Sequence, residues 1–411
     1  MGIKHGLGNV MNYRIPFGGL KIGAYARGLI ADTIEENWVS EGPLVREFEK
    51  RFAARFCYKH AIVTSSGTDA GTVIWSAVRE LCGRRWGDGV VLTPACAFVA
   101  TASCLLASGC NPRFIDVDLE TLNIDVKAIK ENTTPVGILR NLPTIIQTIR
   151  HEQTVGIQFV ATMGNPSPID EVAEIVEAHN LYLIADQCES HGAMLHGKDV
   201  GRYADASIYS FYAAHLIVGG EGGIICTDDD ELADMCRSIK SHGRPLGSIY
   251  FDFQRPGFNS KWNEFCAAVA LEGLENFDEN FAKRRRTRKR LYQMLASLNL
   301  AWGKFILYPD EWPDQVISPH AFPLVLKDPD GNIAPLYECL DKSGIQCKTL
   351  FGSLPTQHRA FEFLGYKPGD FPVAERVGRT GLQLPCNEFM TDDDVVFVVD
   401  KIREFCLKED M

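Results

Sequence analysis

The sequence lacks several features by which whole classes of protein are recognised. Its 13 cysteines include no Cys-x-x-Cys or Cys-x-Cys pair and no zinc-like grouping with histidine, so we expect reduced, mostly buried thiols and no metal site. No apolar run approaches the roughly 18 residues of a membrane helix, and residues 1–19 lack the apolar core of a signal peptide. These absences predict a soluble cytoplasmic protein that does not bind membranes.

Positive charge is also scarce. The chain has 42 Lys and Arg against 53 Asp and Glu, a net charge of -11, which argues against a nucleic-acid or membrane-surface binder. The exception is residues 283–290, KRRRTRKR, where seven of eight residues are basic. A nucleic-acid contact is one interpretation of this run. Because the rest of the chain is acidic, we favour a solvated helix that joins two domains.

Short apolar runs alternate with longer amphipathic ones through the first two thirds of the chain. This alternation predicts an α/β fold, a largely parallel sheet with helices on both faces. With 411 residues, the chain is too long for one small core, and the pattern changes near residue 282. We therefore expect a large domain of residues 1–282 and a smaller C-terminal α/β domain of residues 283–411. The expected strands are 89–94, 113–118, 156–162, 181–186, 206–212 and 223–229, and the expected helices include 65–81 and 168–180.

Four segments contain residues suited to a phosphorylated aromatic ligand. Residues 65–71, SSGTDAG, precede a helix whose N-terminal N–H groups could hold a phosphate, although many helices begin this way simply as a cap. Asp186 ends a buried strand and could keep a pyridinium nitrogen protonated, or could merely cap the next turn. Phe98 could stack on a flat ring or belong to the core. Ser210, at the end of another strand, could reach a phosphate.

His215 lies five residues after Ser210, before a glycine-rich turn. That turn is not a P-loop, because it lacks Gly-Lys-Ser/Thr. A lone histidine is usually structural, but an imidazole with an ordinary pKa of about 6.5 is well suited to proton transfer. Both interpretations remain open from these residues alone.

Taken in order, these segments resemble the sugar aminotransferase family DegT/DnrJ/EryC1/StrS. Further similar stretches are 38–53, 114–125, 257–277 and 371–385, so the resemblance covers nearly the whole chain. It implies a fold type I, aspartate-aminotransferase-like α/β fold with a mostly parallel seven-stranded sheet. It also implies pyridoxal 5'-phosphate or pyridoxamine 5'-phosphate as the cofactor.

The resemblance assigns a role to each candidate residue. It makes Asp186 the partner of the pyridine nitrogen and Phe98 the stacking ring, and it places Glu189 near the ring hydroxyl, where family aminotransferases usually have Gln. Asn259 would reach the phosphate of the neighbouring subunit, which implies a homodimer with shared active sites. The residues that would hold the phosphate within the chain are Gly67, Thr68 and Ser210.

His215 departs from the family's aminotransferases, in which the sixth residue of Ser-Phe-x-x-x-Lys binds the cofactor covalently and then shuttles protons. Imidazole has no primary amine, so only proton transfer remains. The sequence resembles the lysine-less 3-dehydratase branch, typified by GDP-4-keto-6-deoxy-D-mannose 3-dehydratase, whose members serve deoxysugar biosynthesis for lipopolysaccharide O-antigens. A second, related branch carries an iron-sulfur cluster, which we do not expect here because no Cys-x-Cys exists.

The implied reaction is removal of the C3 hydroxyl of a nucleotide-linked 4-keto-6-deoxyhexose, with His215 as acid and base and glutamate as amino donor. Two alternatives stay open: a nucleotide-sugar 4-aminotransferase, either unusual or a lysine-to-histidine variant, and a non-catalytic cofactor-binding relative. Residues 347–361 resemble a segment of the dehydratase branch but depart from its Leu-Phe-x-Gly-Asn pattern, so they are either a sugar-nucleotide contact or a surface loop. Residues 139–156 form a longer connection than is usual in the family, and the sequence gives it no role.

Overall fold

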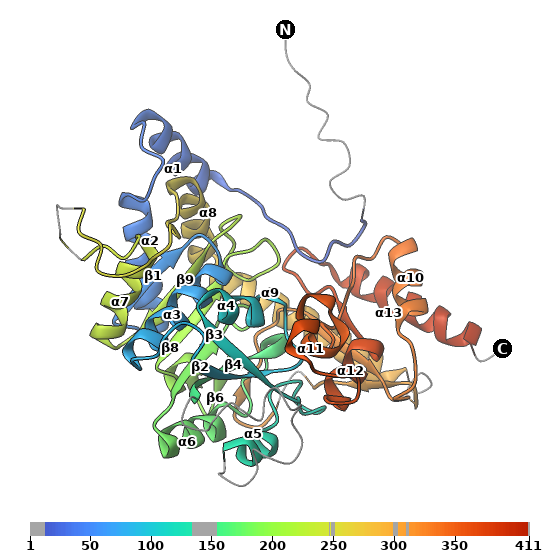
Figure 1. Cartoon of the computed structure of the whole chain (residues 1–411). Helices are drawn as coiled ribbons and strands as arrows, with labels where there is room; N and C mark the ends of the chain where they lie inside the picture. The colour runs from blue at the N-terminus through green and yellow to red at the C-terminus, as the bar shows by residue number, and fades with distance from the viewer. Residues whose placement is uncertain are drawn as a thin grey trace.

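The computed structural model describes residues 13–133, 154–245, 247, 251–298, 303–309 and 312–409. It consists of a large α/β unit and a smaller C-terminal unit beside it (Figure 1). Most of the connection at 139–156 lies outside the described residues, which resume at Thr154 with a strand.

The large unit is built on a seven-stranded sheet. All strands but β9 point the same way, and β9 runs antiparallel to both of its neighbours, β1 and β8. The expectation of a mostly parallel seven-stranded sheet is therefore confirmed. In spatial order the strands are β1 (His60–Thr64), β9 (Gly223–Thr227), β8 (Ala206–Ser210), β5 (Tyr182–Asp186), β4 (Thr154–Val160), β2 (Gly89–Pro94) and β3 (Cys110–Ile115).

Helices cover both faces of this sheet, which explains why its strands are apolar throughout. Ile225 of β9 packs on the face covered by α3, α4 and α7, whereas the preceding Ile224 packs on the face covered by α2 and α8. This alternation follows from the two-residue period of a strand. The helices of the large unit are α1 (Ala24–Glu35), α2 (Pro43–Phe56), α3 (Gly67–Leu81), α4 (Ala100–Ala107), α5 (Val126–Thr133), α6 (Ile169–His179), α7 (Asp230–Lys240) and α8 (Glu264–Glu275).

The smaller unit packs three helices against an antiparallel sheet whose order is β10-β12-β14-β13. Ile15, near the other end of the chain, bridges to Ile345 and joins the same core. The boundary expected after residue 282 falls inside α9 (Phe277–Ser297), which runs from one unit into the other (Figure 1), and its exact place stays a prediction. The remaining elements here are β10 (Phe305–Leu307), β12 (Phe322–Leu326), α10 (Ala334–Lys342), β13 (Lys348–Thr349), α11 (Leu354–Gln357), α12 (Pro372–Thr380), β14 (Gly381–Leu384) and α13 (Asp392–Glu409).

A third, three-stranded sheet of short strands joins the two units. It contains β6 (Met194–Leu195), β7 (Lys198–Asp199) and β11 (Gln315–Val316).

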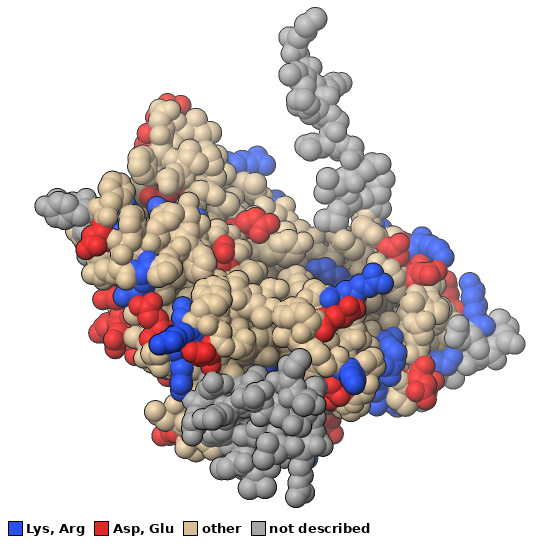
Figure 2. Space-filling model, in the orientation of Figure 1, with Lys and Arg blue, Asp and Glu red and all other residues tan. Residues whose placement is uncertain are grey.

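The basic run of α9 is helical, but the expectation that it is solvated is correct for one side only. Arg284 and Arg288 are fully buried, and Nη1 of Arg288 donates a hydrogen bond of 2.6 Å to the carbonyl of Ala321. Acidic and basic side chains are interspersed over the face seen in Figure 2, with no broad basic patch. Among the described helices, none has the length and apolar character needed to cross a bilayer.

Candidate active site

A cavity of about 1010 Å³ lies at the carboxyl ends of the parallel strands, where α/β sheets bind their ligands. Asp186 and Ser210, the last residues of β5 and β8, line its floor, and the N-terminus of α3 closes one end. The smaller unit supplies the opposite wall. Every predicted site residue except Asn259 lines this cavity, namely Gly67, Thr68, Phe98, Asp186, Glu189, Ser210 and His215.

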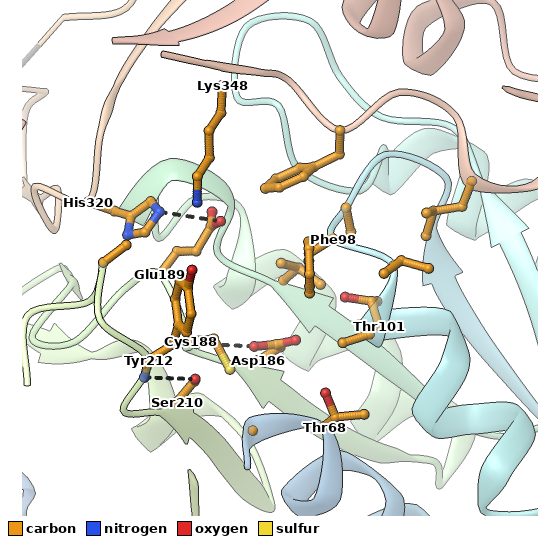
Figure 3. A pocket seen from close by; sticks show the side chains of 18 of the residues that line it. Thr68, Phe98, Thr101, Asp186, Cys188, Glu189, Ser210, Tyr212, His320 and Lys348 are labelled. Carbon is orange, nitrogen blue, oxygen red and sulfur yellow. Dashed lines mark hydrogen bonds and ion pairs between the residues drawn. The ribbon is translucent and has the colours of Figure 1, made fainter. Parts of the chain in front are cut away.

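The α3 end of the cavity has the features of a phosphate site. Ser66 caps the helix by accepting a hydrogen bond from the N–H of Asp69 at 3.0 Å, which leaves the N–H groups of Gly67 and Thr68 without partners inside the helix. A Cβ at Gly67 would lie 2.8 Å from Cβ of Ser210, so only glycine allows the helix and the strand to approach this closely. Thr68 and Ser210 sit together at this end (Figure 3). Backbone donors, hydroxyls and the positive end of a helix dipole together suit a phosphate.

Asp186 and Phe98 suit an aromatic nitrogen-containing ring. Asp186 is 9% exposed and accepts a hydrogen bond from the N–H of Cys188 at 3.1 Å. Burial raises the pKa of Asp186, and the hydrogen bonds from Cys188 oppose that rise. Phe98 is 59% exposed, and its ring borders the cavity above Asp186 (Figure 3), so a flat ring bound here would meet both side chains.

Glu189 is held by both units of the protein. Its carboxylate accepts a hydrogen bond of 3.0 Å from the N–H of Met163 and lies 3.6 Å from Nε2 of His320. Burial raises the pKa of Glu189 to about 7, while the ammonium of Lys348 acts in the opposite direction. The carboxyl group can therefore donate or accept a proton near neutral pH.

His215 lies on the loop that follows β8, where its backbone N–H donates a hydrogen bond of 2.9 Å to the carbonyl of Tyr212. Its ring centroid is 5.3 Å from that of His320 and 6.1 Å from that of His191. Burial, then these two histidines and the cations Arg284 and Lys348, hold the pKa of His215 well below its usual value. This environment favours the neutral form of the His215 imidazole over the protonated form more strongly than the free side chain does.

The similarity suggested by these motifs extends over almost the whole chain. The model of the DegT/DnrJ/EryC1/StrS aminotransferase family matches residues 21–403. The chain belongs to this family. The family's aminotransferase-like α/β fold and its pyridoxal or pyridoxamine phosphate cofactor, both expected from the sequence, are confirmed.

Relatives within the DegT/DnrJ/EryC1/StrS family include proteins named as 3-dehydratases and proteins named as GDP-perosamine synthases. The spore coat polysaccharide biosynthesis protein SpsC of Bacillus subtilis is 28% identical, with 96% of this chain and 97% of that protein covered. The GDP-4-keto-6-deoxy-D-mannose 3-dehydratase of Yersinia pseudotuberculosis is 29% identical, with 85% and 88% covered. The solved E. coli enzyme of that name, with bound hydrated PLP, superposes with a TM-score of 0.81 at 23% identity, over 96% of this chain and 100% of that one.

Several residues of the cavity wall were not predicted individually, and two of them have ionisable groups that act on Glu189. His320 precedes β12, and Lys348 lies on β13, within the segment 347–361 whose role the sequence left open. Nζ of Lys348 lies 4.4 Å from the ring centroid of Phe17 and points toward Glu189 (Figure 3). Burial lowers the pKa of Lys348, and Glu189 opposes that change. Segment 347–361 is therefore more than a surface loop, because much of it lines this cavity.

Asn259 is the one predicted family residue outside the cavity. It is exposed and pairs through its backbone with Ser241. Its contact with the phosphate of a neighbouring subunit stays a prediction. Within the described residues, no cluster of three or more His, Cys, Asp or Glu side chains could hold a metal ion.

Proposed function

We propose that this chain is a pyridoxal-phosphate-dependent 3-dehydratase that removes the C3 hydroxyl of a nucleotide-linked 4-keto-6-deoxyhexose. The observation that supports the proposal most directly is the position of His215. It lines the cavity on the loop after β8, and the motif that contains it resembles the one in which the family's aminotransferases have their covalent lysine. The protein resembles the GDP-4-keto-6-deoxy-D-mannose 3-dehydratases over most of its length.

The residues of the cavity would hold the cofactor without a covalent bond. Thr68 and Ser210 would bind its phosphate, and the carboxylate of Asp186 would keep its ring nitrogen protonated. When bound, the cofactor supplies an electron sink that acidifies a neighbouring carbon and allows the hydroxyl on the adjacent sugar carbon to leave.

The proposed work of His215 is proton transfer in this site. Burial and the nearby cations favour its neutral form, and a neutral imidazole would accept the proton from that acidified carbon and later return a proton. Glu189, with a pKa of about 7, could exchange a proton with the ring hydroxyl of the cofactor. No amine at residue 215 competes with the bound substrate for the cofactor.

Substrate profiling with product mass analysis tests the proposal. The protein is incubated with pyridoxal phosphate, glutamate and a panel of GDP-, CDP-, UDP- and dTDP-linked 4-keto-6-deoxyhexoses. We expect a product that has lost one oxygen atom, together with one ammonia and one 2-oxoglutarate. The variant His215→Asn is the matched control and should give no product. An aminosugar as the main product would reject the proposal.

Lys348 favours a second candidate, a nucleotide-sugar aminotransferase. Its primary amine reaches the same cavity from β13, and among the described residues it makes no hydrogen bond or ion pair. If this amine bound the cofactor covalently, borohydride reduction would attach the cofactor to the peptide containing Lys348. Peptide mass analysis of the wild type and of Lys348→Arg decides this. The dehydratase proposal expects no adduct in either protein.

The assembly and the partners follow from the same proposal. The substrate is a nucleotide-diphospho-4-keto-6-deoxy sugar, the amino donor is glutamate, and the protein works in the cytoplasm as a homodimer with shared active sites. Asn259 is exposed and lies outside the cavity of its own chain. This position supports shared active sites, because the side chain could contact the cavity of another subunit.

A further inference from the structure

Arg284 is fully buried in α9 and contacts the loop that contains His215. Its Nη1 donates to the carbonyl of Ala214 at 3.1 Å, and its Nη2 donates to the carbonyl of His215 at 2.8 Å. Its Nε donates to the carboxylate of Glu388 at 2.7 Å. Glu388 lies between β14 and α13, so one guanidinium connects the smaller unit to the loop of the candidate catalytic histidine.

Apart from the backbone that Arg284 holds, few contacts orient the imidazole ring of His215. A catalytic imidazole is usually fixed by a hydrogen bond to its second nitrogen. Here Nδ1 is buried without a hydrogen-bond partner among the described residues. The direction of the ring is therefore set by the backbone of residues 214–215 and by the rings packed beside it.

We propose that Arg284, held in place by Glu388, is the positioning residue that fixes His215 for proton transfer. The inference rests on the proposed function in one respect, that His215 is the group that moves the proton. It also gives a role to one arginine of the basic run 283–290, whose sequence first suggested only a solvated helix or a nucleic-acid contact.

Only arginine suits this position. Its planar fork presents two N–H groups to two successive carbonyls and a third to a carboxylate, which the single ammonium of lysine cannot do with the same geometry. Glu388 is nearly buried, with 9% of its side chain exposed, so removing its partner alone would leave a carboxylate without compensation.

The charge of Arg284 acts on His215 as well. The groups that surround the imidazole are Tyr212 on its own loop, His191 after β5, His320 before β12, Lys348 on β13 and Arg284 on α9. Arg284 lowers the pKa of each of the three histidines. Removing its positive charge should therefore raise the pKa of His215.

The first test keeps the positive charge at residue 284 and removes the planar guanidinium. In Arg284→Lys we expect kcat to fall about tenfold to a hundredfold with little change in KM, because the bound substrate meets a misplaced base. The matched control is Arg286→Lys, an exposed arginine of the same helix, whose kcat should equal that of the wild type. If Arg284→Lys folds and turns over like Arg286→Lys, the proposal is wrong.

The second test removes both charges together, so that neither buried group is left alone. In the double variant Arg284→Gln/Glu388→Gln, NMR titration of the histidines in cofactor-free protein should show a higher pKa for His215, and the acid limb of the pH profile should move to higher pH. The His215 resonance is assigned from its loss in His215→Asn. An unchanged titration in folded protein would contradict the action of the Arg284 charge on His215.

These outcomes are independent of the reaction assignment. The titration is read without substrate, so a shifted pKa stands even if product analysis finds an aminosugar. Conversely, unchanged titration and turnover in the folded variants reject the positioning role of Arg284 whatever the reaction is.

Discussion

At residue 215 the loop after β8 presents an imidazole to a cavity that otherwise suits a pyridoxal-type cofactor. Burial, together with His191, His320 and the two cations around the position, disfavours a further positive charge there. A lysine ammonium placed here would face the same opposition, and its neutral amine would be free to bind the cofactor. We therefore expect the side chain at this one position to decide between covalent and non-covalent use of the cofactor.

Restoring the amine should reverse that choice. In His215→Lys we expect the cofactor to become covalently attached, with a visible absorbance that borohydride abolishes, and dehydration to fall at least about a hundredfold. The adduct is located by peptide mass analysis, with His215→Gln as the control that has no amine. Full dehydratase activity in His215→Lys would contradict the role given to the imidazole.

Glu189 predicts a specific dependence of stability on pH. Its pKa of about 7 lies above the ordinary glutamate value, so folding favours the protonated form, and its stabilising effect is lost as pH rises from about 4.5 through 7. For cofactor-free protein, the free energy of unfolding of Glu189→Gln minus that of the wild type should therefore be larger at pH 8 than at pH 5. The difference should be at most about 3 kcal/mol, because one pKa unit corresponds to about 1.4 kcal/mol.

Urea unfolding of Glu189→Gln and of the wild type at the two pH values measures this difference. Glu177→Gln, an exposed glutamate on α6, is the matched control and should show no such dependence. The same result for both variants would mean that Glu189 is not protonated by burial.

At the scale of elements, the close approach of α3 to β8 shapes the end of the cavity that is proposed to hold the cofactor phosphate. Gly67→Ala would place a Cβ 2.8 Å from Cβ of Ser210 and 3.1 Å from Sγ of Cys188. Such crowding costs about 1–3 kcal/mol. Where it distorts the end of the cavity, we expect the cofactor Kd to rise by about fivefold to somewhat over a hundredfold.

Titration of cofactor fluorescence measures that change in Kd. The control is Gly28→Ala on α1, where a Cβ would meet no atom within 4 Å. Equal affinities in the two variants would show that α3 does not form the phosphate site.

Much of the large unit could be predicted because its strands are buried on both faces. The run 89–94 has the same bounds as β2, and the bounds of the other expected strands lie within three residues of those of β3, β4, β5, β8 and β9. The antiparallel direction of β9 could not be predicted, because an apolar run between turns reads the same in either direction. Strand β1 was not predicted, because its five residues are a short apolar run next to the much longer helical pattern of α3.

The site was predictable only where family motifs contain it. Asp186 and Ser210 end recognisable strands, so their convergence follows from sheet topology. His320 and Lys348 come from the smaller unit, and no local pattern shows that they lie near Glu189. The burial of Arg284 was hidden for a similar reason, since its partners lie 69, 70 and 104 residues away along the chain.

At the scale of the whole molecule, the smaller unit closes the cavity and the proposed second subunit completes it. If Asn259 acts in the partner's site, chains with Asn259→Ala and chains with His215→Asn should complement each other. A mixed dimer would then contain one intact site, so random mixing should restore about a quarter of wild-type turnover.

Co-expression with two different affinity tags, followed by tandem purification, isolates the mixed dimer for assay. Each variant alone should be impaired. No recovery in the mixed dimer would place Asn259 in its own subunit's site or outside any site.

The central claim is that the amino nitrogen of glutamate is released as ammonia, while the sugar loses the oxygen of its C3 hydroxyl. The most direct measurement supplies glutamate with an isotopically labelled amino nitrogen, together with the nucleotide sugar that turns over fastest, and follows the label by mass spectrometry. The account predicts labelled ammonia and a sugar that contains no label and one oxygen atom fewer. Label retained in the sugar, with its C3 hydroxyl intact, would contradict it.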